Sequence, residues 1–188
     1  MTDRGDRGRA RALGAILGFI GGALIVGGAV APWAQSEGIS VGPAAIPGDV
    51  RGWEVSFGLF AVAAGVSALI LALIALLASR RKTRLLGSGL IVAALIAGTF
   101  VVLSFLDLDQ TFVDFAIARA IDAGVQVDGV EASIRQLMEL GSLNIEPGLG
   151  LWISGGGVVL ALIGGSLLLV AGPRPAKATA DMGFISTR

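Results

Sequence analysis

The chain has 188 residues, of which 54% are hydrophobic and 15% charged, and its mean hydropathy is +0.83. These values lie outside the usual range for a soluble domain and indicate a membrane protein. Cysteine, histidine and tyrosine are absent, which excludes disulfides, catalytic thiolates, and the zinc, iron–sulfur and haem sites that depend on Cys or His ligands.

Four long apolar segments contain no charged residue, and they cover residues 12–31, 55–78, 85–106 and 149–172. A helix rises about 1.5 Å per residue, so each segment is long enough to cross a hydrocarbon core of roughly 30 Å. The segments are continuously apolar, unlike the alternating strands of a transmembrane barrel. The predicted fold class is therefore all-α, a four-helix transmembrane bundle.

The first segment follows a basic arm, residues 1–11, and ends in Ala29-Val30-Ala31. This arrangement resembles a signal peptide with its cleavage site. However, the apolar run is longer than a typical signal sequence, and Pro32 would occupy the first position after the cut. We therefore expect an uncleaved membrane helix, and a mature N-terminus beyond Ala31 would contradict this expectation.

The loop 32–54 between the first two segments is rich in Gly and Pro and carries only isolated apolar residues. It is expected to form either a short hairpin or an extended strap. Pro43 and Pro47 argue against a regular strand of defined bounds.

The loop after the third segment is predicted to contain two helices. Asp109 can cap a first helix that runs to about Ala123 and is ended by Gly124. Asp128, with Glu131 three residues later, resembles a capping box at the start of a second helix. Gly141 is expected to end that second helix, as Gly124 ends the first.

Both helices of this acidic loop, residues 107–148, carry apolar faces that they cannot bury against each other alone. The faces need either the mouth of the bundle or another protein. We expect a small two-helix cap that closes the bundle, with a docking surface for a partner as the alternative. The charged residues that a partner would meet are Asp114, Arg119, Glu131, Arg135 and Glu139.

The net charge of zero results from two opposite pools. The basic arm, the hairpin 79–84 and the tail 173–188, expected to be disordered, sum to about +8, and the two intervening loops to about −8. The positive-inside rule therefore predicts a multi-pass membrane protein with both termini cytoplasmic, and it makes the cap extracytoplasmic. Trp33, Trp53 and Trp152 fall at the outer helix ends and are expected to anchor the membrane interface.

Glycine is concentrated in the first and fourth segments, where small residues let two helix backbones approach closely in lipid. Such packing predicts either contacts within the chain or a homo-oligomer, and the first explanation is the simpler one. The glycines assigned to helix packing are Gly14, Gly18, Gly22, Gly156 and Gly164.

No residue pattern predicts a chemical centre. The membrane segments contain serine and threonine but no ionisable residue that would bind or relay a charge. Asp107, Asp109 and Asp114 could hold a divalent cation or act on a lipid, but helix capping and the helix dipole also explain them. We therefore predict no catalytic residue, no cofactor, no metal site and no nucleic-acid partner, with membrane lipid as the surroundings.

Three short motifs carry a family resemblance: Ala31-Pro32-Trp33-Ala34, the Arg-rich hairpin 80–84, and the sequence PGLGLW at 147–152. With them the chain resembles small four-span membrane proteins of actinobacteria, in particular the tryptophan-biosynthesis-associated membrane protein group. The resemblance implies an integral membrane protein of unknown molecular activity and transfers no catalytic residue. Claudin-like proteins share the topology, but they carry a cysteine pair in the first outer loop that this chain lacks.

These observations favour a non-enzymatic membrane protein that acts by association, as an accessory or assembly subunit of a bacterial cell-envelope complex. The alternative is an oligomeric carrier, pore or holin-like permeabilising protein for a small solute. An enzyme that acts on lipid is the third possibility, and it would have to use the carboxylates of the acidic loop.

Overall fold

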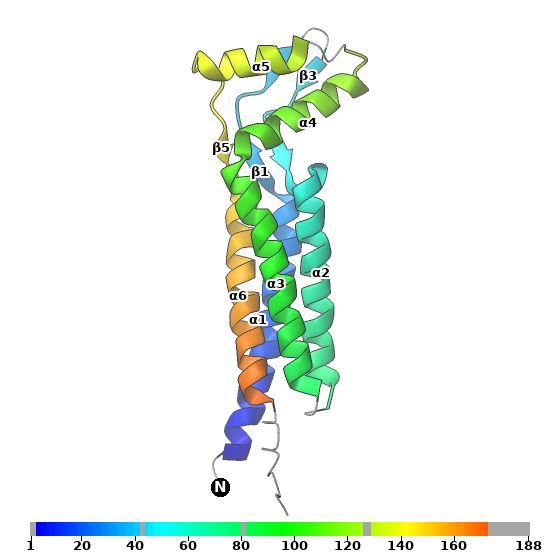
Figure 1. Cartoon of the computed structure of the whole chain (residues 1–188), viewed down its shortest axis with the longest axis vertical. Helices are drawn as coiled ribbons and strands as arrows, with labels where there is room; N and C mark the ends of the chain where they lie inside the picture. Colours follow the sequence, from blue (N-terminus) through cyan, green and yellow to red (C-terminus); the bar gives the residue numbers. More distant parts are fainter. Residues whose placement is uncertain (1–2, 42–43, 80–81, 126–128, 173–188) are drawn as a thin grey trace, which may run out of the picture.

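The structure is a computed structural model, and it describes residues 3–41, 44–79, 82–125 and 129–172. Within these ranges, four helices are long and apolar enough to cross a membrane: α1 (Asp3–Val30), α2 (Ser56–Leu77), α3 (Thr83–Leu106) and α6 (Leu149–Ala171). They stand side by side as a long bundle (Figure 1) in which α1 and α3 each pack between α2 and α6. The predicted all-α, four-span bundle is therefore confirmed.

The first helix begins well before the apolar segment, because the basic arm continues it as far as Asp3. One arginine of this arm binds the neighbouring helix. Arg11 donates from Nε and Nη2 to the Ala75 carbonyl (3.2 and 2.8 Å), and also to the carbonyls of Leu76 and Ala78. These carbonyls lie in the last turn of α2 and at its C-cap. Carbonyl groups at the end of a helix have no intrahelical hydrogen-bond donor and carry partial negative charge. Arg11 therefore ties α1 to the end of α2.

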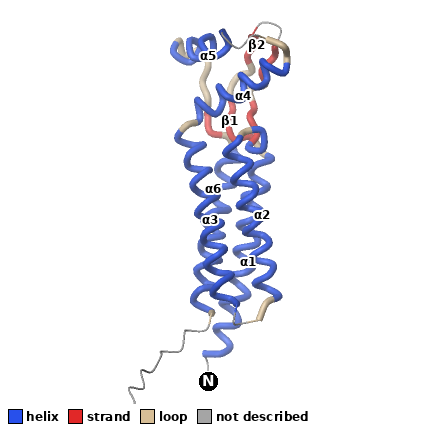
Figure 2. Tube along the Cα trace, turned by 45° about the vertical axis from the view of Figure 1, so that its right-hand side comes forward, coloured by secondary structure: helices blue, strands red, loops and turns tan. Residues whose placement is uncertain are grey.

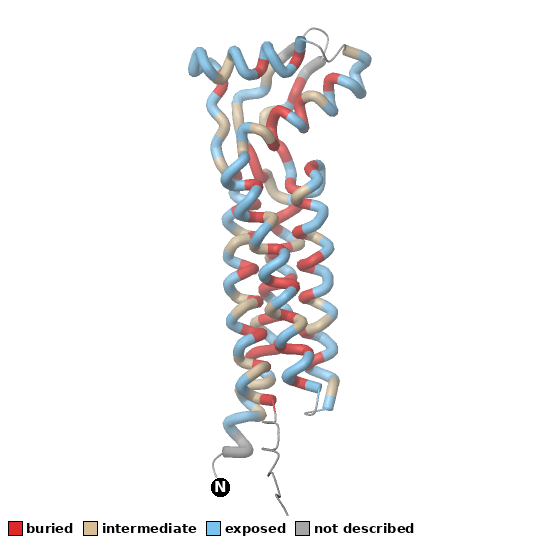
Figure 3. The backbone as a smooth tube through the Cα atoms, in the orientation of Figure 1, coloured by how far each residue is buried: buried red, intermediate tan, exposed pale blue. Residues whose placement is uncertain are grey.

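Buried and exposed positions alternate along the helices of the bundle (Figure 3). Small residues fill most of the buried positions, together with Ile25, Leu90 and Leu168, while many large apolar residues are exposed. This distribution suits lipid, where helices gain no hydrophobic drive and associate through close backbone packing. The buried positions of α2 illustrate it, since all are glycine or alanine: Gly58, Ala61, Ala64, Gly65, Ala68, Ala72 and Ala75.

Four of the five glycines assigned to helix packing lie at contacts within the chain. A Cβ on Gly14 would lie 2.8 Å from the Gly164 carbonyl oxygen, and a Cβ on Gly164 would lie 2.5 Å from the Gly18 nitrogen. Gly22 meets the backbone of α2 in the same way. Gly156 does not, because α6 turns it outward and a Cβ there would meet no atom within 4 Å. The prediction that Gly156 packs against another helix is therefore wrong for the helices of this chain.

The first loop forms short strands that connect the bundle to the cap (Figure 2). The strands among the described residues are β1 (Pro32–Gln35), β2 (Ile39–Val41), β3 (Ala44–Ile46), β4 (Asp49–Arg51) and β5 (Glu146–Pro147). β1 is the centre of an antiparallel sheet of order β4-β1-β5, and β2 pairs with β3 as a hairpin. A 3₁₀ turn, η1 (Gly52–Glu54), leads into α2. The loop therefore contains the expected hairpin, together with a sheet that was not predicted.

The second loop contains two helices, α4 (Leu108–Asp122) and α5 (Val130–Glu139). Asp107 ends α3 and begins α4, so the chain bends there without a connecting loop. The prediction that Asp109 caps α4 is wrong, since Asp109 lies in the first turn, where its carboxylate faces the helix dipole. Gly124 and Gly141 follow the two helices with positive φ of 73° and 66°, the left-handed conformation that ends a helix. The capping role predicted for Asp128 lies outside the described residues.

The apolar faces of α4 and α5 are covered by the chain itself. Together with the five strands these helices form the cap, which lies at the end of the bundle remote from the N-terminus (Figure 1). Its core joins side chains of both helices to side chains of the strands, namely Phe112, Val113, Ala116, Val130, Ile134, Trp33, Ile46 and Val50. The cap thus buries the largest side chains of the molecule, Trp33 and Phe112, at the end of the bundle.

Candidate functional site at the junction of bundle and cap

Trp33 is the central side chain of this junction. It is 0% exposed, and its Nε1 donates to the Gly28 carbonyl (3.1 Å) at the end of α1. Gly52 packs directly on its indole ring, where no side chain would fit. The prediction that Trp33 anchors the membrane interface is therefore wrong, because β1 carries the indole under the sheet. Trp53 and Trp152 are 52% and 62% exposed, and their position at the membrane interface stays a prediction.

An ion pair connects the cap to the bundle. Arg119 of α4 places Nη2 2.7 Å from Oε1 of Glu54, in the turn before α2. The other oxygen of Glu54 accepts from the Arg51 backbone N–H (3.0 Å). The Arg119 guanidinium also lies over the Phe115 ring, 5.2 Å from its centroid. One ion pair therefore joins α4 to the turn before α2, and a local contact holds the side chain at each of its ends.

A second polar chain runs from α5 to α4. Arg135 Nε pairs with Glu131 (2.9 Å), and its Nη2 donates to the Gln110 side-chain oxygen (2.8 Å). Gln110 in turn donates to Asp114 (2.7 Å). Four of the five residues predicted as a partner surface are thus used within the chain. Glu139 is exposed and is the fifth.

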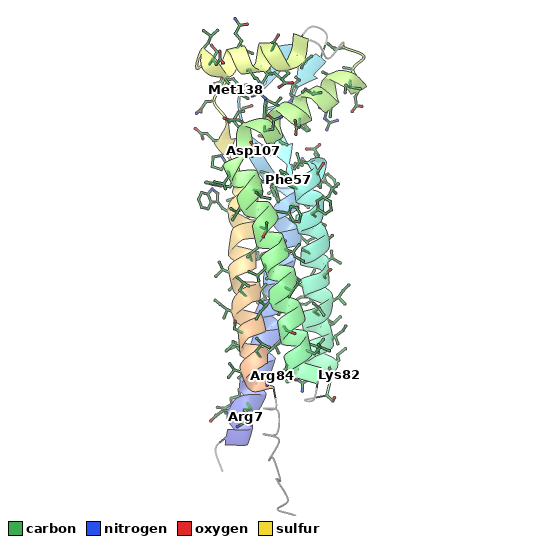
Figure 4. All side chains as sticks on the ribbon, in the orientation of Figure 1. Arg7, Phe57, Lys82, Arg84, Asp107 and Met138 are labelled. Carbon is green, nitrogen blue, oxygen red and sulfur yellow. The ribbon has the colours of Figure 1, made fainter. Side chains whose placement is uncertain are left out.

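A cleft of about 250 Å³ opens between the start of α2 and α4. Three carboxylates line it, those of Glu54, Asp107 and Asp114, together with the rings of Phe57 and Phe115. Figure 4 labels Phe57 and Asp107 at this end of α2 and α3. Arg119 neutralises Glu54, whereas the two aspartates have no cationic partner among the described residues. The cleft therefore carries an excess of negative charge.

The sequence pattern places Asp107 and Asp114 in one acidic group but does not connect Glu54 with them. The bend at Asp107 brings α4 over Glu54. No local sequence pattern in the loop predicts that bend. Asp109, the third member of the predicted acidic group, does not line the cleft. Within the described ranges, no group of three or more carboxylates is placed to hold a metal ion.

The lipid-facing surface has two apolar grooves. One, of about 360 Å³, lies between α2 and α3 and extends from Phe60 to Leu71 on α2, with Gly89 and Ala93 on α3. The other, of about 340 Å³, lies between α3 and α6 beside Trp152 and Gly155. Both grooves form where a glycine or alanine replaces a large side chain on the outer surface.

The bundle interior offers little chemistry. Ser154 donates to the Ile25 carbonyl (3.3 Å), and Ser104 is buried with an unpaired hydroxyl. The described part of each spanning helix has no ionisable residue inside its apolar segment. A path for ions or protons normally needs such a residue at membrane depth.

Comparison of the chain with protein-family models, with curated proteins and with solved structures gives no match. The resemblance to four-span actinobacterial proteins therefore stays a prediction.

Proposed function

We propose that the protein is an accessory or assembly subunit of a bacterial cell-envelope complex, without a catalytic site of its own. In this proposal it lies in the plasma membrane with both termini in the cytoplasm, and its cap contacts the partner outside. The observation that carries the proposal is the contrast between the two parts of the molecule. The bundle is held by close backbone contacts, whereas the cap is built around an apolar core that continues to the adjoining ends of α2, α3 and α6, and it has its own polar cross-links.

The closed bundle argues against transport through a single chain. Gly14, Gly18 and Gly164 bring α1 and α6 into backbone contact, which leaves no lumen between them. A carrier or pore would therefore have to form between several copies. Gly27 and Gly156 leave open positions on the outer surface of α1 and α6, and a second copy could approach the bundle there.

The cap supports the proposal because it holds an ordered surface away from the membrane. Its polar cross-links join α5 to α4 and α4 to the turn before α2. Glu139 and Leu140, at the end of α5, are exposed. This end of α5 is the part of the predicted partner surface that we assign to intermolecular contact.

The test is photo-crosslinking in intact cells from a photoreactive residue at position 139. Glu37, an exposed residue in the loop between β1 and β2, serves as the matched control. The proposal expects one discrete protein product from position 139 and none from position 37. Identical products from both positions, or only lipid products, would refute it. Solute flux through liposomes that contain the purified protein would favour the pore alternative.

A further inference from the structure

The acidic cleft and the α2–α3 groove lie one after the other along the same pair of helices. Phe57 lines the cleft, and Phe60, one turn further along α2, lines the groove. Phe100 of α3 joins them, with its ring stacked on Phe60 (centroids 4.9 Å apart) and tilted against Phe57 (6.1 Å). The acidic cleft and the α2–α3 groove therefore share one wall of aromatic side chains.

The groove has the length and the surface of a site for an acyl chain. Between Phe60 and Leu71 it follows α2 for about 16 Å, close to the depth of one membrane leaflet. Gly89 and Ala93 keep its floor low. Ser67 bears the one hydroxyl in its lining, and that hydroxyl donates to the Ala63 carbonyl (2.8 Å). The groove thus presents no free polar group to a hydrocarbon chain.

The cleft determines which headgroup would fit. Asp107 and Asp114 are exposed carboxylates without a cationic partner, and Asp114 accepts only a neutral amide N–H from Gln110. A primary ammonium group would give them charge-assisted hydrogen bonds. The rings of Phe57 and Phe115 add aromatic surface that attracts a cation. A headgroup with net negative charge would be repelled.

We propose that this composite site binds a phospholipid with a primary-amine headgroup, such as phosphatidylethanolamine. The ammonium lies between Asp107 and Asp114, and one acyl chain lies in the α2–α3 groove. The inference does not rest on the partner proposed for the cap, since its residues line the cleft and the groove and exclude Glu139 and Leu140.

The test uses the full chain in nanodiscs made of equal amounts of phosphatidylethanolamine and phosphatidylglycerol, followed by native mass spectrometry of the retained lipid. We expect preferential retention of phosphatidylethanolamine. The double variant D107N/D114N should lower that retention by about tenfold or more, because two charge-assisted hydrogen bonds become neutral ones. The double variant D122N/E139Q removes two exposed carboxylates that do not line the cleft, and it should retain the lipid as the parent does.

The groove is tested separately by G89L, whose side chain would fill the floor beside Leu71. G156L adds the same side chain at an open position of α6 and is its control. G89L should lose the lipid while its unfolding midpoint stays near that of G156L.

Three outcomes would overturn the proposal. The first is equal retention of the two phospholipids by the parent protein. The second is loss of phosphatidylethanolamine to the same extent in D107N/D114N and D122N/E139Q. The third is displacement of the lipid by millimolar Mg²⁺ with Mg²⁺ bound in its place, which would make the cleft a cation site.

Discussion

Alanine at two glycines of α6 should change the stability of the bundle in opposite directions. At Gly164, the new Cβ would lie 2.5 Å from the Gly18 nitrogen and 2.6 Å from the Gly14 carbonyl oxygen, whereas ordinary contact begins at 3.4 Å. Backbone atoms cannot rotate away, so α1 and α6 must separate. At Gly156, the same Cβ meets nothing within 4 Å.

The magnitudes follow from this geometry. Overpacking a close contact costs about 1–3 kcal/mol, and a gap of about 0.5–1 Å forfeits a quarter to a half of each neighbouring dispersion contact. Alanine recovers about 0.5–1 kcal/mol of helix propensity at either position. We therefore expect G164A to be destabilised by about 1–2 kcal/mol and G156A to be stabilised by about 0.5–1 kcal/mol.

The assay is reversible unfolding in mixed micelles of increasing SDS content, followed by tryptophan fluorescence. The two variants differ by one methyl group each on the same helix, so composition and micelle effects cancel in the comparison. Equal shifts for both variants, or a loss of stability in G156A, would refute the assignment of Gly164 to a backbone contact and of Gly156 to open surface.

Three further predictions concern the arm, the junction and the topology. R11A should lower the free energy of unfolding by about 1–3 kcal/mol, because the last carbonyls of α2 lose a charged donor, while R9A in the same SDS titration should change little. W33F should destabilise the protein by about 1–3 kcal/mol, since the Gly28 carbonyl loses its indole donor, and W53F should not; acrylamide quenching that reaches Trp33 in the folded parent would contradict the burial on which this rests. Because the chain has no cysteine, E139C and R9C each carry a single thiol, and a membrane-impermeant maleimide should label only E139C in intact cells; the reverse pattern would invert the predicted orientation.

The parts of the fold that sequence predicts are those set by length and charge. A span needs about 20 apolar residues whatever its neighbours are, so the four membrane helices follow directly from the segments. Gly124 and Gly141 mark the ends of α4 and α5 because a left-handed residue after a helix strongly favours glycine. These signals are local, and local signals suffice for the existence of an element.

Positions that depend on which way a helix faces were harder to predict. In a lipid-facing helix both the inner and the outer surfaces are apolar, so no periodicity distinguishes Gly156 from Gly164. Trp33 raises the same difficulty, since an indole at the end of a span suits a membrane interface as well as a buried junction. The strands are two to four residues long and depend on pairing between β1 and β5, which lie more than a hundred residues apart.

That long-range pairing also constrains how the protein is assembled in the membrane. β1 follows α1 and is synthesised early, and its partner β4 follows within the same loop. The other edge of β1 pairs with β5, which is synthesised directly before the last membrane helix. Contacts of such high sequence separation form late, because a long loop must close first. Insertion of α6 would therefore complete the sheet and the burial of Trp33 in one step. A chain truncated before Glu146 should expose an open strand edge and be degraded by quality-control proteases.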